Sequence, residues 1–86
     1  MTYVTVRYWA AAKEAAGVAE ETLAADTLAG VVDAALARRG GDARLREVLE
    51  RSSFLVDGTA VGRRGGAGVT LPDAAVVEVL PPFAGG

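Results

Sequence analysis

The clearest helical pattern in the chain is Thr27-Leu28-Ala29-Gly30-Val31-Val32-Asp33-Ala34-Ala35-Leu36-Ala37-Arg38-Arg39, and the rest of the fold can be inferred from it. Counted from Leu28, apolar residues recur at i, i+3, i+4, i+7 and i+8, which places them in one stripe. Thr27 is a suitable N-cap, Gly40-Gly41 ends the helix, and Arg38-Arg39 complement the negative end of its dipole. A helix with one apolar face must cover another apolar layer. We therefore expect a sheet beside it.

The segments around this helix predict that sheet. From Thr2 to Tyr8 the sequence alternates, with Val4, Val6 and Tyr8 on one face, as in a strand with one buried side. Asp57-Gly58 is a strong hairpin signal. In chain order we expect a strand at 2–8, a helix at 10–16 capped by Gly17, a strand at 18–24, helices at 28–39 and 42–51, a hairpin at 53–61 and a strand at 75–80. This order predicts an α+β domain over residues 1–80, with the helices on one face.

Composition limits the classes of function. The 86 residues suit a single domain with a modest core, and 51% hydrophobic with 23% charged residues fits a compact protein. The net charge is −2 and the basic residues are scattered, so no basic surface for nucleic acid is expected. Neither a signal peptide nor a membrane-length apolar run is found, and there is no cysteine for disulfides. A cytoplasmic location is the expectation.

The missing residue types restrict the chemistry further. Without histidine or cysteine, the chain lacks a Ser-His or Cys-His nucleophile and any imidazole or thiolate ligand, so no metal site is expected. Glu20 and Glu21 are adjacent in a predicted strand, so their side chains should point to opposite faces. The domain is a poor candidate for an enzyme acting alone. The one distinctive reactive group left is the C-terminal carboxylate of Gly86.

The last six residues, Pro81-Pro82-Phe83-Ala84-Gly85-Gly86, predict a separate tail. The two prolines fix their backbone angles and favour a short, stiff, extended segment, whereas Gly85 and Gly86 lack side chains and can enter a narrow channel. Fully extended, six residues reach roughly 20 Å. We interpret residues 81–86 as a flexible Gly-Gly tail that carries its terminus into a partner's active site. The alternative is a frayed, glycine-rich chain end without function.

A glycine-rich loop at 62–68 invites comparison with phosphate-binding loops. It lacks the Lys-Ser/Thr ending of a P-loop and the spacing of a dinucleotide loop, and no helix is predicted after it. A flexible loop is the favoured interpretation. Arg63 and Arg64 remain candidates for contact with an acidic patch on a partner.

Five segments follow one another in a characteristic order: Val4–Ala10, Lys13-Glu14 with Gly17, Val56-Asp57-Gly58, Leu71-Pro72-Asp73 and above all Leu80-Pro81-Pro82-Phe83-Ala84-Gly85-Gly86. In this order they resemble the small subunit of molybdopterin synthase, a ubiquitin-like β-grasp sulfur-carrier family. The resemblance spans essentially the whole chain. It implies a mixed sheet of four to five strands covered on one face by a main helix, with the last strand central and parallel to the first. Family members often carry Gly-Asp-Glu where this chain has Ala74-Ala75-Val76.

The resemblance also implies a function. An adenylating, E1-like partner would use ATP and Mg²⁺ to activate Gly86, and a sulfurtransferase would supply the sulfur of a thiocarboxylate. The large subunit of molybdopterin synthase would then receive that sulfur to build the dithiolene. This chain would bind no cofactor itself. The alternative functions are a carrier for cysteine, thiamine or tRNA thiolation, a protein modifier, or a non-covalent β-grasp binding module. Apart from the resemblance, we expect Leu80 and Phe83 to fill apolar pockets on partners; the alternative is that they pack on the domain itself.

Overall fold

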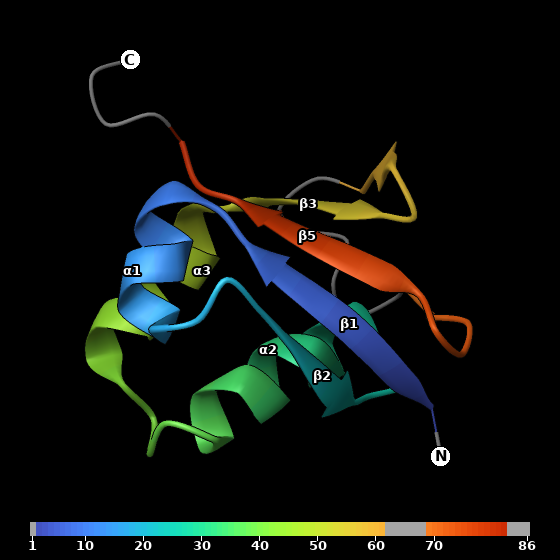
Figure 1. Cartoon of the computed structure of the whole chain (residues 1–86), viewed down its shortest axis with the longest axis horizontal. Coiled ribbons are helices and arrows are strands. Elements are labelled where there is room, and N and C mark those ends of the chain that lie inside the picture. The colour runs from blue at the N-terminus through green and yellow to red at the C-terminus, as the bar shows by residue number, and fades with distance from the viewer. Residues whose placement is uncertain (1, 62–68, 83–86) are drawn as a thin grey trace.

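The computed structural model describes residues 2–61 and 69–82. The order of elements matches the sequence prediction, and Figure 1 shows them packed as a sheet with helices beside it. The elements are β1 (Tyr3–Tyr8), α1 (Ala10–Ala16), β2 (Glu20–Ala24), α2 (Leu28–Ala37), α3 (Ala43–Arg51), β3 (Ser53–Val56), β4 (Thr59–Ala60) and β5 (Val76–Leu80).

The five strands form one mixed sheet in the order β2-β1-β5-β3-β4. β5 lies between β1 and β3, parallel to β1 with Tyr8 opposite Val79, and antiparallel to β3 with Ser53 opposite Leu80. The central, parallel last strand implied by the family resemblance is therefore confirmed. Such a sheet, with helices packed against it, is the ubiquitin-like β-grasp fold.

The core lies between the sheet and the three helices, which are on one side of it (Figure 1). Val4, Val6 and Tyr8 of β1 are buried, as their alternation predicts. The stripe on α2 faces the same core, although Val32 is only partly buried at its edge. None of the described helices is long and apolar enough to cross a membrane.

The expected caps and turns are present. The Thr27 hydroxyl accepts a hydrogen bond of 3.0 Å from the Gly30 amide, and Gly17 ends α1 with a φ of 81°. Asp57 and Gly58 both have positive φ, at 49° and 83°, as a two-residue hairpin with the twist of its strands requires.

Six predicted boundaries differ from the structure by one to two residues, including the starts of β1 and α3, which each lie one residue later than predicted. α2 ends at Ala37 because Arg38 is its cap and Gly40-Gly41 turn the chain with positive φ. β2 begins at Glu20 rather than Val18, since only one backbone hydrogen bond, from the Tyr8 amide to the Ala19 carbonyl, precedes it. β4 ends at Ala60, and β5 begins at Val76, after a turn.

Candidate functional site

The base of the predicted tail is held firmly by the sheet. β5 bonds to a strand on each side, and the Trp9 amide extends the parallel pairing with a 3.2 Å hydrogen bond to the Val79 carbonyl. Leu80 and Pro81 are partly buried, whereas Pro82 is exposed. The chain therefore leaves the domain from a fixed point at the end of a central strand.

The described residues include only part of the predicted site. Leu80, Pro81 and Pro82 follow one another at the end of β5, as expected. Six other predicted site residues lie outside the described residues, namely Phe83, Ala84, Gly85, Gly86, Arg63 and Arg64.

The sheet face opposite the helices carries side chains that the sequence analysis did not select. The Trp9 indole Nε1 donates a 3.2 Å hydrogen bond to Glu78, and the Arg7 guanidinium lies 5.3 Å from the centre of the Trp9 ring. Trp9 and Tyr3 keep 43% and 52% of their surface exposed. The sequence alternation could have predicted this cluster, because Trp9 continues the alternation that places Tyr3, Thr5 and Arg7 on one face of the strand. These contacts of Arg7 and Glu78 hold the Trp9 side chain in place next to the base of the tail.

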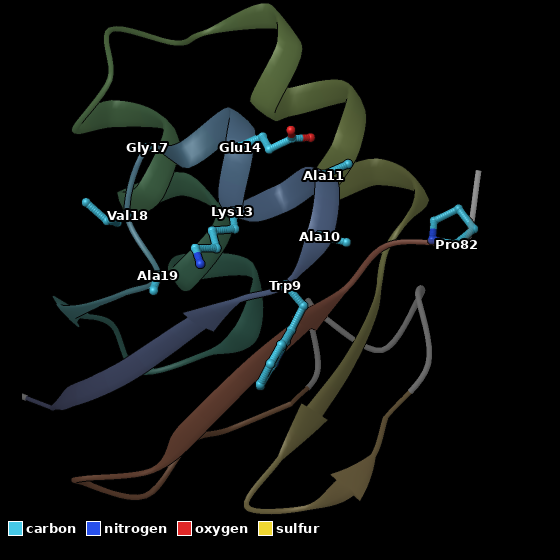
Figure 2. A pocket seen from close by; sticks show the side chains of 9 residues that line it. All are labelled: Trp9, Ala10, Ala11, Lys13, Glu14, Gly17, Val18, Ala19 and Pro82. Carbon is cyan, nitrogen blue, oxygen red and sulfur yellow. The ribbon is translucent and has the colours of Figure 1, made fainter. Parts of the chain in front are cut away.

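A groove opens between this surface and α1, directly beside the tail base. Its volume is about 850 Å³. Figure 2 shows Pro82 at one end, Val18 and Ala19 at the other, and the Trp9 side chain between them. Lys13 points into the same region from α1, while Glu14 leaves the helix in another direction. The groove combines an apolar wall with a single cation.

Comparison with known proteins identifies the family of this chain and relatives that share its fold. The sequence model of the ThiS family matches residues 6–86. The chain belongs to the ThiS family. It is thus a ubiquitin-like sulfur carrier of that family. Among curated protein sequences, none matches the chain.

Solved structures share the fold of this ThiS-family chain at low sequence identity. Small archaeal modifier protein 1 from Methanosarcina acetivorans is 22% identical, with a TM-score of 0.78 over 100% of this chain and 98% of its own. A Pyrococcus furiosus protein assigned as subunit 1 of a molybdopterin converting factor is 23% identical, with a TM-score of 0.75 over 96% of this chain and 100% of its own. A complex of molybdopterin-converting factor subunits 1 and 2 from Helicobacter pylori contains a chain that is 22% identical, with a TM-score of 0.66 over 99% and 100%.

A second polar cluster, on the helix side of the sheet, supports the fold of this ThiS-family protein. The Glu21 carboxylate accepts hydrogen bonds from the Tyr8 hydroxyl and from the Arg39 guanidinium, the latter at 2.9 Å. Arg39 also donates to the carbonyls of Ala16 and Ala35, both at 2.9 Å, and so links the ends of α1 and α2 to β2. Glu20 pairs with Arg7 across the other face, which confirms that the two glutamates point to opposite sides.

The pKa values in this cluster are coupled. Burial would raise the pKa of Glu21, but the hydrogen bonds from Arg39 and Tyr8 outweigh burial and lower it. Burial raises the pKa of Tyr8 well above its usual range, and the hydrogen bond to Glu21 adds to this effect. The hydrogen bond to Glu21 raises the pKa of Arg39. At neutral pH the cluster is an ion pair with a neutral phenol, which suits a structural role.

Proposed function

We propose that this chain is the sulfur-carrier small subunit of a molybdopterin synthase, with Gly86 as the residue that carries the sulfur. The observation that supports this most directly is the position of β5, which is bonded to β1 and β3 and continues without a loop into Pro81-Pro82. A tail anchored in this way costs less conformational entropy to order in a partner's site than a tail on a loose end.

The proposed chemistry begins with activation of the tail. A terminal carboxylate is ionised at neutral pH and its carbonyl carbon is a weak electrophile. An adenylating partner with Mg²⁺ and ATP would join a Gly86 oxygen to the α-phosphate and release pyrophosphate. Sulfur supplied by a sulfurtransferase at the oxidation level of hydrosulfide would then attack the acyl carbon, displace AMP and leave a thiocarboxylate. The sequence contains no phosphate-binding motif of its own, so the charge stabilisation for these steps would come from the partner.

The sulfur would next pass to the pterin precursor in the large subunit. The Helicobacter pylori complex of subunits 1 and 2 supports a large-subunit partner of this kind. Leu80, which is partly buried at the end of β5, and Phe83 would fill apolar pockets on that partner. Arg63 and Arg64 would contact an acidic patch.

The test is the intact mass of the chain after incubation with an adenylating enzyme, ATP and a sulfur source. Replacement of one oxygen by sulfur raises the mass, and a chain lacking Gly86 serves as the control that must stay unchanged. Adding a molybdopterin synthase large subunit and the pterin precursor then tests the acceptor. If the thiocarboxylate forms but no dithiolene product appears, the carrier assignment stands and the molybdopterin assignment is wrong.

A second candidate function is protein modification, which the similarity to small archaeal modifier protein 1 favours. In that case activated Gly86 would form an isopeptide bond with a lysine of another protein. Conjugates of higher mass in cells, lost when Gly86 is deleted, would distinguish a modifier from a sulfur carrier. A non-covalent binding module would tolerate both the deletion of Gly86 and an extension beyond it.

A further inference from the structure

We propose that the groove beside Pro82 is a docking site for the chain's own last four residues, 83–86. In this docked state Phe83 lies against the apolar wall at Trp9, and the Gly86 carboxylate approaches the ammonium group of Lys13. The tail then alternates between a docked state and an extended state that partners bind.

The groove has room for a short segment of chain. Its volume is about 850 Å³. Trp9 and Val18, which are 43% and 40% exposed, both line it. Among the described residues, Tyr3 is the one other large hydrophobic residue with comparable exposure, and it lies on the open sheet face instead. The two exposed apolar side chains lie in one hollow and offer contact surface to an apolar side chain.

The connection through Pro82 identifies the occupant. Pro82 is itself part of the groove wall (Figure 2), so the four residues that follow it in the sequence are tethered at the groove. Four extended residues span about 13 Å at roughly 3.3 Å each. A segment tethered so closely has an effective concentration in the millimolar range, so even a contact with millimolar intrinsic affinity is occupied about half of the time. An external peptide of the same affinity would need to be that concentrated in solution.

The charge in the groove suits the end of the tail. Lys13 is the single lysine of the chain, and within residues 2–61 and 69–82 it forms no ion pair. Glu14 also lines the groove, but Figure 2 shows its side chain directed away from that of Lys13. An ammonium group at this position would attract a carboxylate or thiocarboxylate at Gly86.

Docking would change how accessible the Gly86 carboxylate is to other molecules. A docked carboxylate is shielded from chance reactions, and a partner that offers a better pocket for Phe83 would release it. The inference does not depend on sulfur chemistry, because a chain that never accepts sulfur would still dock its tail. Failure of the thiocarboxylation test and failure of the docking test are therefore separate results.

The fluorescence of Trp9, the single tryptophan, gives the first test. Compared with a chain ending at Pro82, the full chain should show a blue-shifted emission maximum and reduced quenching by acrylamide. The variant Phe83→Ala should resemble the shortened chain, whereas Phe83→Leu should retain most of the shift. Identical spectra and quenching for the full and shortened chains would overturn the proposal.

Zero-length coupling with a carbodiimide gives the second test. The expected product is an amide between Lys13 and Gly86, formed with loss of one water and located by peptide mass spectrometry. Its yield should be independent of protein concentration, fall strongly in Phe83→Ala and Val18→Ser, and vanish in Lys13→Arg and in a C-terminally amidated chain. A yield that rises with concentration would show contact between two copies instead, and a yield unaffected by Phe83→Ala would show an undocked tail; either result contradicts the proposal.

Discussion

Asp57 and Val76 are joined by two hydrogen bonds that close the beginning of β5 against the tip of the hairpin. The Asp57 amide donates to the Val76 carbonyl at 2.9 Å, and the Val76 amide donates to Asp57 Oδ1, also at 2.9 Å. Asp57 is thus a turn residue with positive φ, and its side chain also helps to set the register of β5 against the hairpin.

Replacing Asp57 by alanine should therefore lower the free energy of unfolding by about 1–2 kcal/mol, because the Val76 amide loses its acceptor and alanine tolerates positive φ poorly. Asp57→Asn is the matched control, since asparagine offers the same acceptor and tolerates this conformation. Urea unfolding of the three proteins measures the difference. Equal losses in both variants would contradict the assigned role of the side-chain oxygen.

Ala74→Gly should stabilise the domain. Ala74 has a φ of 66° in the turn before β5, where its amide donates to the Tyr3 carbonyl at 2.8 Å. The left-handed conformation costs a residue with a Cβ roughly 1–2 kcal/mol, and part of the gain is offset by the greater freedom of glycine in the unfolded chain. We expect a net gain of about 0.5–1 kcal/mol, measured by thermal and urea unfolding. Unchanged or reduced stability would mean that this turn relaxes without strain.

Stability in acid should depend on Glu21. Because its pKa is lowered in the folded state from an ordinary value of 4.5, the ionised group stabilises the domain above that value. This contribution is lost as the pH falls through the folded-state pKa. Glu21→Gln should reduce stability at pH 7 by about 1–2 kcal/mol, because two charge-assisted hydrogen bonds are weakened, and should flatten the acid side of the pH profile.

Glu20→Gln is the control for this experiment. Glu20 lies on the opposite face and contacts the exposed Arg7 at 3.9 Å, an arrangement that contributes little to stability. Its variant should follow the original protein at every pH. If Glu20→Gln and Glu21→Gln gave the same profile, the Tyr8–Glu21–Arg39 cluster would not be the source of the acid sensitivity.

Phe83→Ala should weaken binding to a large subunit about tenfold or more, in keeping with the truncation of a buried aromatic anchor. The folding of the domain should not change, which circular dichroism and urea unfolding can verify. Isothermal titration with the large subunit measures the affinity. An unchanged dissociation constant in a normally folded variant would exclude Phe83 as an anchor.

Local patterns predicted most of the fold, and contacts between distant residues account for what they missed. The spacing from Leu28 and the Asp57-Gly58 turn depend on neighbouring residues, so the sequence identified both. The side chain of Arg39 bonds to Ala16 and Glu21, which lie far away in the sequence, and no local pattern indicates those partners. The assignment of Arg39 to the dipole of its own helix was therefore incomplete.

For the candidate site, too, local sequence predicted some features, whereas others depend on contacts between distant residues. Pro81 and Pro82 indicated a stiff exit by their backbone restrictions alone. The central place of β5 came from family resemblance, because the pairing of a strand with a partner over 70 residues away is not encoded in either strand. The groove was missed because Trp9, Lys13 and Val18 become neighbours only when α1 folds back beside β1.

The central position of β5 also imposes an order on biosynthesis. The ribosome makes β5 after every other element, yet β5 separates the pair β2-β1 from the pair β3-β4. Until it emerges, the nascent chain holds two hairpin-like halves with nothing to join them, and each exposes an open strand edge. Assembly of the five-stranded sheet is consequently a late event, because it cannot finish before β5 has been made.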